Sequence, residues 1–150
     1  MPLAASIENK VFRVHGELSP NLDNLDELVK LQRVKETEHE GVISDILWSD
    51  PEEDIEGFRI SPRGAGFLFE GNTVSKFVEN NKLDCMVRAH QLVLEGYKIM
   101  FDNKLFTVWN ASNYCYRCGN VASIMEVDED LEKVFKIFEV TQTKKNKLLL

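Results

Sequence analysis

Two histidines stand at the ends of short apolar runs. His15 follows the run Val11 to Val14, and His90 follows the run Asp84 to Ala89. Neutral imidazole is a common ligand of transition metals, and working residues of α/β folds often lie at the carboxyl ends of strands. Two imidazoles do not fill a coordination sphere, so the pair indicates part of a metal site.

One arginine lies among small, turn-forming residues. Arg63 stands in the segment SPRGAG, where a planar guanidinium with five donors can reach a phosphate or a carboxylate. An ordinary surface arginine is the competing interpretation. Together with the two histidines, Arg63 fits recognition of a phosphate near a metal, but the three residues form only half a site.

The stretch from Val108 to Asn120, VWNASNYCYRCGN, holds two of the three tyrosines and two of the three cysteines. It lies between two apolar runs with strand character, so it is predicted to be a loop displayed at a sheet edge. Cys115 and Cys118 have the spacing of half a structural zinc site. No second pair accompanies them, so partly buried loop cysteines are the alternative, and Cys85 is expected in the core.

The elements that would position these residues are short. Periodicity predicts helices at 21–33 and 73–80, a short helix or turn at 42–48, and strands at 11–14, 84–89, 99–101, 105–109, 121–127 and 134–140. The order is mixed α/β at the start and antiparallel strands at the end.

Composition narrows the class of protein. The 150 residues suit one domain, and a formal net charge of −7 argues against a general nucleic-acid binder, which needs excess Lys and Arg. No apolar run approaches the roughly 20 residues that cross a bilayer, and MPLAASIENK lacks the features of a signal peptide. A reduced protein of the cytoplasm is therefore expected, with the nucleus as an open alternative.

Five motifs resemble the phosphoprotein phosphatase family in order and spacing: HGELSP, LWSDP, SPRGAG, RAHQLVLEGY and ASNYCYRCGN. The resemblance is strongest to the type 2A-like branch, which comprises types 2A, 4 and 6, and it covers residues 2 to 140. It implies a mixed α/β fold, namely the C-terminal half of the calcineurin-like metallophosphoesterase β-sandwich with flanking helices. A partial Ser/Thr phosphatase domain is expected at 1–140 and a basic, flexible tail at 141–150.

The resemblance also implies a chemistry. His15 and His90 would bind one of two divalent metal ions (manganese, iron or zinc), which activate a hydroxide that attacks phosphoserine or phosphothreonine. Arg63 would grip the phosphate, and Tyr114 would overhang the site. The GDxHG, GDxxDRG and GNHE segments of the family, with the other ligands and the general-acid histidine, do not occur in the sequence. His39, in a polar loop far from any motif, is expected to offer no substitute. The chain should therefore carry ligands for one metal only and be inactive or nearly so alone.

Two residues depart from the family pattern. Glu17 replaces a glycine beside His15 and is expected to strain the turn if that position needs a positive φ. Ser112 replaces a proline that would stiffen the aromatic loop.

Three interpretations remain open. The chain is part of a phosphatase that acts on phosphoproteins together with regulatory or scaffold subunits. It is a non-catalytic module that binds those regulatory subunits. Alternatively, it is an eroded chain whose exposed sheet edges and core faces make it prone to aggregate. None of the three involves nucleic acid or a membrane.

Overall fold

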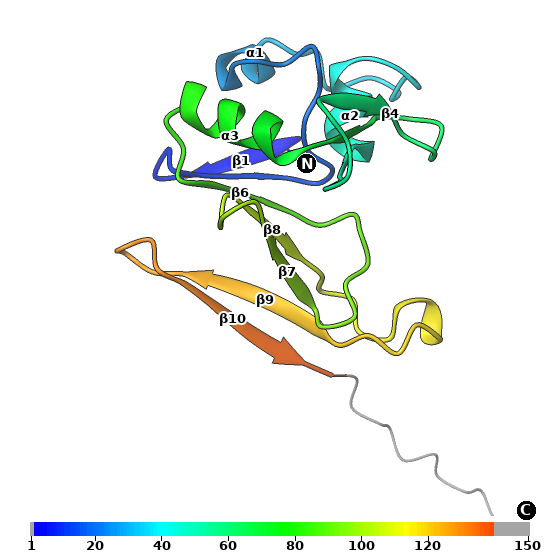
Figure 1. Ribbon diagram of the computed structural model, residues 1–150, viewed down its shortest axis with the longest axis vertical. Coiled ribbons are helices and arrows are strands. Elements are labelled where there is room, and N and C mark those ends of the chain that lie inside the picture. The colour runs from blue at the N-terminus through cyan, green and yellow to red at the C-terminus, as the bar shows by residue number, and fades with distance from the viewer. Residues whose placement is uncertain (1, 140–150) are drawn as a thin grey trace, which may run out of the picture.

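The computed structural model describes residues 2–139, in which a five-stranded sheet carries helices on one face and a hairpin on the other (Figure 1). The strands of the central sheet, in spatial order, are β1 (Ala4–Ile7), β2 (Val11–Val14), β6 (Cys85–Arg88), β8 (Leu105–Val108) and β7 (Tyr97–Met100). The predicted tail at 141–150, and the last residue of the predicted strand 134–140, lie outside the described residues.

The three inner strands of the central sheet run in the same direction. β2 pairs with β6 and β6 with β8 in parallel, whereas β1 and β7 add antiparallel edges. The carboxyl ends of β2, β6 and β8 therefore lie at one edge of the sheet. His15, His90 and the loop after Val108 follow these three strands, so the topology gathers them at one edge.

Helices cover one face of this sheet. In α3 (Gly71–Asn80) the residues Val74, Phe77 and Val78 are buried, and the ring of Phe77 lies 6.0 Å from that of Phe12 in β2. The i, i+3, i+4 spacing predicted this packing, and the prediction is confirmed. The helix α2 (Val42–Trp48) matches the predicted range.

The helix α1 (Leu25–Val29) is much shorter than the predicted helix at 21–33. Asn24 fixes its start through a capping box, since its side chain accepts from the amide of Asp26 while Glu27 accepts from the amide of Asn24. At the other end Val29 is 87% exposed, so no apolar contact extends the helix.

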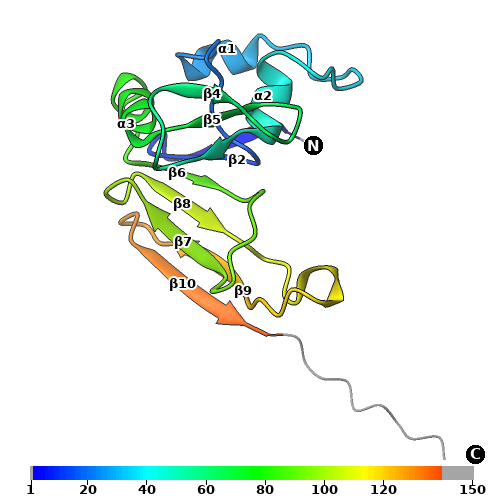
Figure 2. The ribbon, with the colours of Figure 1, turned by 45° about the vertical axis from the view of Figure 1, so that its right-hand side comes forward.

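A small three-stranded sheet lies beside α2 (Figure 2). Its strands, in spatial order, are β3 (Asp50–Pro51), β5 (Phe67–Phe69) and β4 (Phe58–Ile60). Strands of two or three residues leave no alternating pattern in the sequence, and none of them was predicted. This sheet carries Asp50 and the SPRGAG turn.

The hairpin of β9 (Ala122–Val127) and β10 (Lys133–Phe138) packs on the other face of the central sheet. The ring of Phe135 stacks on Tyr97 with centroids 4.1 Å apart, and Met125 joins the same apolar cluster. The predicted antiparallel pair at the end of the chain is thus confirmed within the described residues. Among those residues, no helix is long and apolar enough to cross a membrane.

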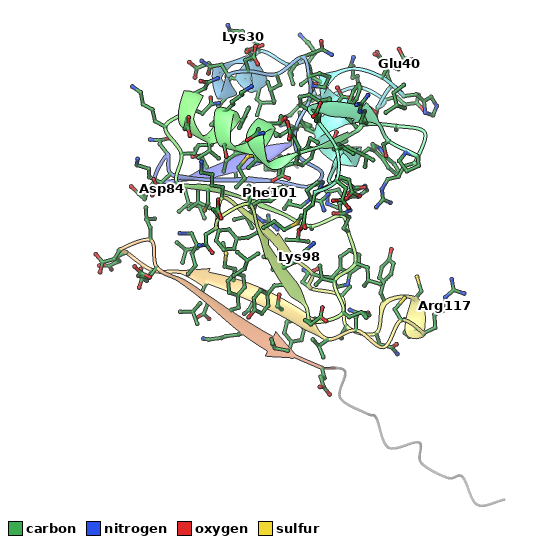
Figure 3. All side chains as sticks on the ribbon, viewed as in Figure 1. Lys30, Glu40, Asp84, Lys98, Phe101 and Arg117 are labelled. Atoms are coloured by element: carbon green, nitrogen blue, oxygen red, sulfur yellow. The ribbon has the colours of Figure 1, made fainter. Side chains whose placement is uncertain are left out.

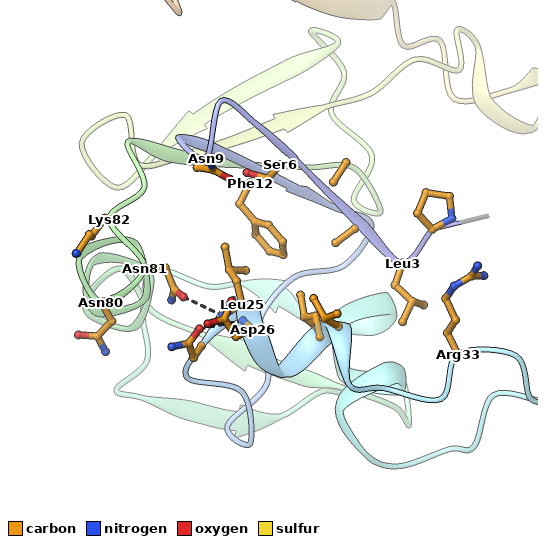
Figure 4. Close-up of a pocket in the computed structure, with 16 residues that line it drawn as sticks. Leu3, Ser6, Asn9, Phe12, Leu25, Asp26, Arg33, Asn80, Asn81 and Lys82 are labelled. Atoms are coloured by element: carbon orange, nitrogen blue, oxygen red, sulfur yellow. Dashed lines mark hydrogen bonds between the residues drawn. The ribbon is translucent and has the colours of Figure 1, made fainter.

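A cavity of about 550 Å³ opens between β1, α1 and the end of α3 (Figure 4). Phe12 and Leu25 contribute to its wall, and Asn81 accepts a hydrogen bond from the amide of Leu25 at 2.9 Å. Large concave cavities are common ligand sites. The cavity is lined by none of the four predicted site residues, which are His15, His90, Arg63 and Tyr114. The candidate site therefore lies elsewhere.

Candidate metal and phosphate site

His15 and His90 meet at the carboxyl edge of the central sheet. Nε2 of His15 lies 3.2 Å from Nδ1 of His90, and the two rings stand edge to face with centroids 5.0 Å apart. The two loops are also joined through the backbone, since the amide of Ala89 donates to the carbonyl of His15 at 3.2 Å. The structure therefore brings the two predicted histidines together, while their role as ligands stays a prediction.

Close backbone packing holds each imidazole in place. The amide of Gly16 donates to the carbonyl of Ile46 at 2.8 Å, and a Cβ on Gly16 would lie 2.5 Å from the carbonyl carbon of Leu47. Only glycine fits this approach to α2. His90 has a φ of 57°, a left-handed conformation that costs a non-glycine residue about 1–3 kcal/mol. The ring of Trp48 packs edge-on against His90 at 5.5 Å.

Both imidazoles favour the neutral form. Burial lowers the pKa of His90 to about 4; Asp50 opposes the shift, and the charges of Arg63 and Arg88 add to it. Burial, followed by Arg88, also lowers the pKa of His15. The neutral imidazole is the form that coordinates a metal, so these shifts keep both side chains ready to act as ligands near pH 7.

The geometry of the pair suits two ligands of one ion. Tetrahedral ligands at roughly 2.0–2.1 Å from zinc lie about 3.3 Å apart, close to the observed 3.2 Å between the two nitrogens. Within residues 2–139, no group of three or more His, Cys, Asp or Glu side chains converges to hold a metal. In addition, the buried Nε2 of His90 has no hydrogen-bond partner, although metal-binding histidines normally donate their second N–H. These residues thus fit part of a coordination sphere.

Arg63 is anchored by a buried carboxylate. Its Nε donates to Oδ2 of Asp50 at 2.5 Å, and its amide donates to Oγ of Ser61 at 3.2 Å within the turn between β4 and β5. The side chain of Arg63 is 37% exposed, whereas that of Asp50 is 4% exposed. Arg63 therefore presents its outer donors to solvent while Asp50 fixes the inner edge of the guanidinium, as binding of an oxyanion requires.

Arg88 connects the histidine loops to this arginine. Its Nε donates to the carbonyl of Gly16 at 3.2 Å, and one terminal nitrogen donates to Oε1 of Gln91 at 2.8 Å. The other terminal nitrogen donates to the carbonyl of Ser49 at 3.0 Å and to Oδ1 of Asp50 at 2.7 Å. Neither Arg88 nor Asp50 was predicted from the sequence as part of the site. The available signal was a charged residue that ends an apolar run directly before the histidine loop.

Glu17 is fully buried, and neither of its carboxyl oxygens has a hydrogen-bond partner. Burial raises its pKa to about 8, against the opposing charge of Arg88. The carboxyl group is therefore mostly protonated at pH 7, and its 4.0 Å approach to Nε of Arg88 is not an ion pair at that pH. Backbone strain was expected at Glu17 only if its φ were positive, and the φ of Glu17 is not positive. The cost of a glutamate at this position is the desolvation of its buried carboxyl group. The close backbone packing that requires a glycine occurs at the neighbouring Gly16.

The aromatic loop leaves the carboxyl end of β8, as predicted. Buried Asn120 holds it closed, since Oδ1 accepts from the amide of Tyr114 at 2.8 Å and Nδ2 donates to the carbonyl of Ala111 at 2.8 Å. The ring of Tyr114 is 45% exposed and packs edge-on against Trp109 at 4.9 Å. Among the described residues, no hydrogen bond or ring contact joins Tyr114 to the histidines or to Arg63.

The cysteines of this loop are free thiols near its tip, where Arg117 projects away from the sheet (Figure 3). Cys115 is exposed and Cys118 half-buried, and in the described part of the chain no further metal-ligating side chain joins them. The zinc half-site therefore has no second half there. Cys85 is buried in β6, as expected.

His39 does not lie far from every motif. It lines a cavity of about 390 Å³ together with Gly64 and Gly66 of the SPRGAG turn, and Asp45 of α2. The expectation that its polar loop lies far from the motifs is wrong, because the chain folds back past α2 to the small sheet.

The fold is that of a calcineurin-like phosphoesterase. Residues 1–94 match the family model with that description, and the chain belongs to this family. It is similar to the serine/threonine-protein phosphatase 4 catalytic subunits of two yeasts. The identity is 54% with Kluyveromyces lactis (96% of this chain, 46% of the relative) and 52% with Saccharomyces cerevisiae (95% and 46%). The chain therefore spans about half the length of these curated relatives.

A solved structure has the same fold. It is the protein serine/threonine phosphatase from Saccharomyces cerevisiae that is described as similar to human phosphatase PP5. The TM-score is 0.85 at 28% identity, over 97% of this chain and 49% of that one. The predicted mixed α/β metallophosphoesterase fold is confirmed, and type 4 belongs to the branch that the five motifs indicated.

Proposed function

We propose that these residues supply one half of the dinuclear centre of a serine/threonine phosphatase. His15 and His90 are two ligands of one metal ion, and Arg63 binds the phosphate of the substrate. The observation that carries the proposal is the 3.2 Å approach of the two imidazole nitrogens, joined to Arg63 through Arg88 and Asp50. When bound, divalent metals (manganese, iron or zinc) supply an activated hydroxide and stabilise the phosphoryl oxygens.

The chain's own residues have separate tasks in this proposal. The neutral imidazoles of His15 and His90 donate lone pairs, and the guanidinium of Arg63 neutralises and orients the phosphate monoester. Tyr114 stands at the same edge of the sheet and shapes the approach of the phosphoprotein substrate. The remaining ligands and the general acid come from outside these 150 residues, so the chain alone is inactive or nearly so.

A chimaera tests the proposal. The part of the Kluyveromyces lactis relative that precedes the region of similarity is fused to this chain and assayed with manganese and a phosphoserine peptide. We expect hydrolysis that falls about 10²–10⁴-fold in His90→Ala, because ligand loss removes several kcal/mol of metal stabilisation. Arg63→Ala should lower kcat/KM by about 10²–10³-fold. Lys10→Ala is the control, because this exposed residue lies at the opposite end of β2 from His15, and it should leave activity unchanged.

Two results would contradict the proposal. One is a chimaera that folds, binds manganese and yet hydrolyses no phosphoserine. The other is an active chimaera whose rate is the same in His90→Ala as in the parent.

A second function is binding without catalysis, in which the chain competes for phosphatase regulatory subunits. This alternative is favoured by the outer face of the β9–β10 hairpin, where Ile124, Val134 and Phe138 are 43–54% exposed. Capture of purified type 4 regulatory subunits by the chain, lost in a Val134→Glu variant that keeps the wild-type fold, would support it. Failure of those subunits to bind would exclude it.

A further inference from the structure

We infer that Arg88 is a positioning residue that sets the metal-binding part of the site relative to the phosphate-binding part. The inference rests on the proposed function. The side chain of Arg88 is completely buried, and it touches neither a metal position nor the exposed donors of Arg63. It acts through the loops that carry His15, His90 and Arg63.

A single guanidinium connects segments from three parts of the chain. It reaches Gly16 after β2, Gln91 after β6, and Ser49 and Asp50 at the start of the small sheet, with all four contacts between 2.7 and 3.2 Å. Gly16 and Gln91 are the residues directly after His15 and His90. Both histidine loops are therefore fixed to the same planar group.

The link to the phosphate-binding side passes through Asp50. Oδ1 of Asp50 accepts from Arg88 and Oδ2 accepts from Nε of Arg63, so one buried carboxylate lies between two arginines. Any rotation of the Arg88 guanidinium moves Asp50, and with it the inner edge of Arg63. The position of Arg63 relative to the imidazoles is therefore set by Arg88.

The chemistry of the contacts requires arginine. Four acceptors bond to one side chain, and only the rigid guanidinium fork, whose donors point in several directions, can reach them together. A lysine ammonium keeps the charge but places its three donors at one point. A buried ion pair is often no better for stability than apolar packing, so the value of this network lies in fixing geometry.

The test uses the 150-residue chain and charge-conserving variants. Titration with Co²⁺ is followed on the ring signals of His15 and His90, and titration with inorganic phosphate on the Nε–H signal of Arg63. In Arg88→Lys we expect both affinities to fall at least tenfold. Phe77→Leu is the matched control, because it perturbs the core under α3 away from these loops and should leave both affinities unchanged after correction for the folded fraction.

Two partial variants separate positioning from general stability. Gln91→Ala removes the contact beside His90 and should weaken cobalt binding but not phosphate binding. Asp50→Glu keeps the charge but displaces the carboxylate that holds Arg63, so it should weaken phosphate binding more than cobalt binding. The opposite effects of these two variants on cobalt and phosphate binding also test the inference if Arg88→Lys does not fold.

The inference fails if wild type binds both ligands while Arg88→Lys binds them equally well, or if every variant loses both affinities in proportion to its folded fraction. A wild-type chain that is folded and binds neither Co²⁺ nor phosphate would instead overturn the proposed function, and the inference with it.

Discussion

Gly66 and Gly119 form a matched pair for substitution, because both have a φ of 68° and only one is crowded. A Cβ on Gly66 would lie 2.7 Å from the amide nitrogen of Ser49 and 2.8 Å from the carbonyl carbon of Trp48. A Cβ on Gly119 would meet nothing within 4 Å. The two nearest neighbours of Gly66 are backbone atoms, which cannot rotate away as a flexible side chain would.

The magnitudes follow from these contacts. An alanine in the left-handed region costs about 1–2 kcal/mol at either position. Overpacking at Gly66 adds about 1–3 kcal/mol. We therefore predict that Gly119→Ala lowers the free energy of unfolding by about 1–2 kcal/mol and Gly66→Ala by about 2–5 kcal/mol. The carbonyl of Gly66 also accepts from the amide of Ser61 at 3.2 Å, so the larger change reaches the turn that carries Arg63.

Urea unfolding followed by circular dichroism measures both variants against the wild type. Equal losses in the two variants would refute the reasoning, because strain at positive φ would then account for the whole effect. A Gly66→Ala chain that unfolds like the wild type would refute the close approach itself.

Three further predictions concern the interior of the site and the aromatic loop. The folded chain holds the Glu17 proton up to about pH 8, while the unfolded chain releases it near pH 4.5, so the stability of the wild type should fall as pH rises through this window. Glu17→Gln removes that slope and should gain about 3 kcal/mol over the wild type between pH 4 and pH 7 in urea unfolding; an unchanged slope would contradict the assignment. The ring signals of His90 should titrate with a pKa of about 4 because of burial, and a midpoint near 6.5 in the folded chain would show that the imidazole is exposed. Asn120→Ala leaves the amide of Tyr114 and the carbonyl of Ala111 without their partner, and should lower the free energy of unfolding by about 1–3 kcal/mol. Hydrogen exchange at Tyr114 that is no faster in this variant would argue against the role of Asn120.

Local patterns predicted those helices and strands whose apolar residues follow a regular spacing in the sequence. The apolar run before His15 predicts the strand β2. The i, i+3, i+4 spacing predicts the helix α3 together with its buried face. The five motifs, in their order and spacing, identified the family, because each motif encodes a local geometry that the family shares. His15, His90 and Arg63 could therefore be named from the sequence.

The remaining parts depend on contacts between distant residues. The edge strand β1 has three exposed residues of four, and β3 has only two residues, so neither shows a strand pattern. Arg88 donates to residues 16, 49, 50 and 91, which come from three segments of the chain. The sequence around Arg88 contains no pattern that predicts these partners. The same holds for Glu17, whose burial results from the packing of its loop on α2.

We propose above all that these 150 residues hold half of a phosphatase site. This proposal is tested most directly by the manganese-dependent phosphatase activity of the purified chain, measured beside His90→Ala. We predict no activity above that of the variant, because the two imidazoles supply only part of one coordination sphere. Activity in the wild-type chain that disappears in His90→Ala would contradict this account, since the chain would then contain a complete site.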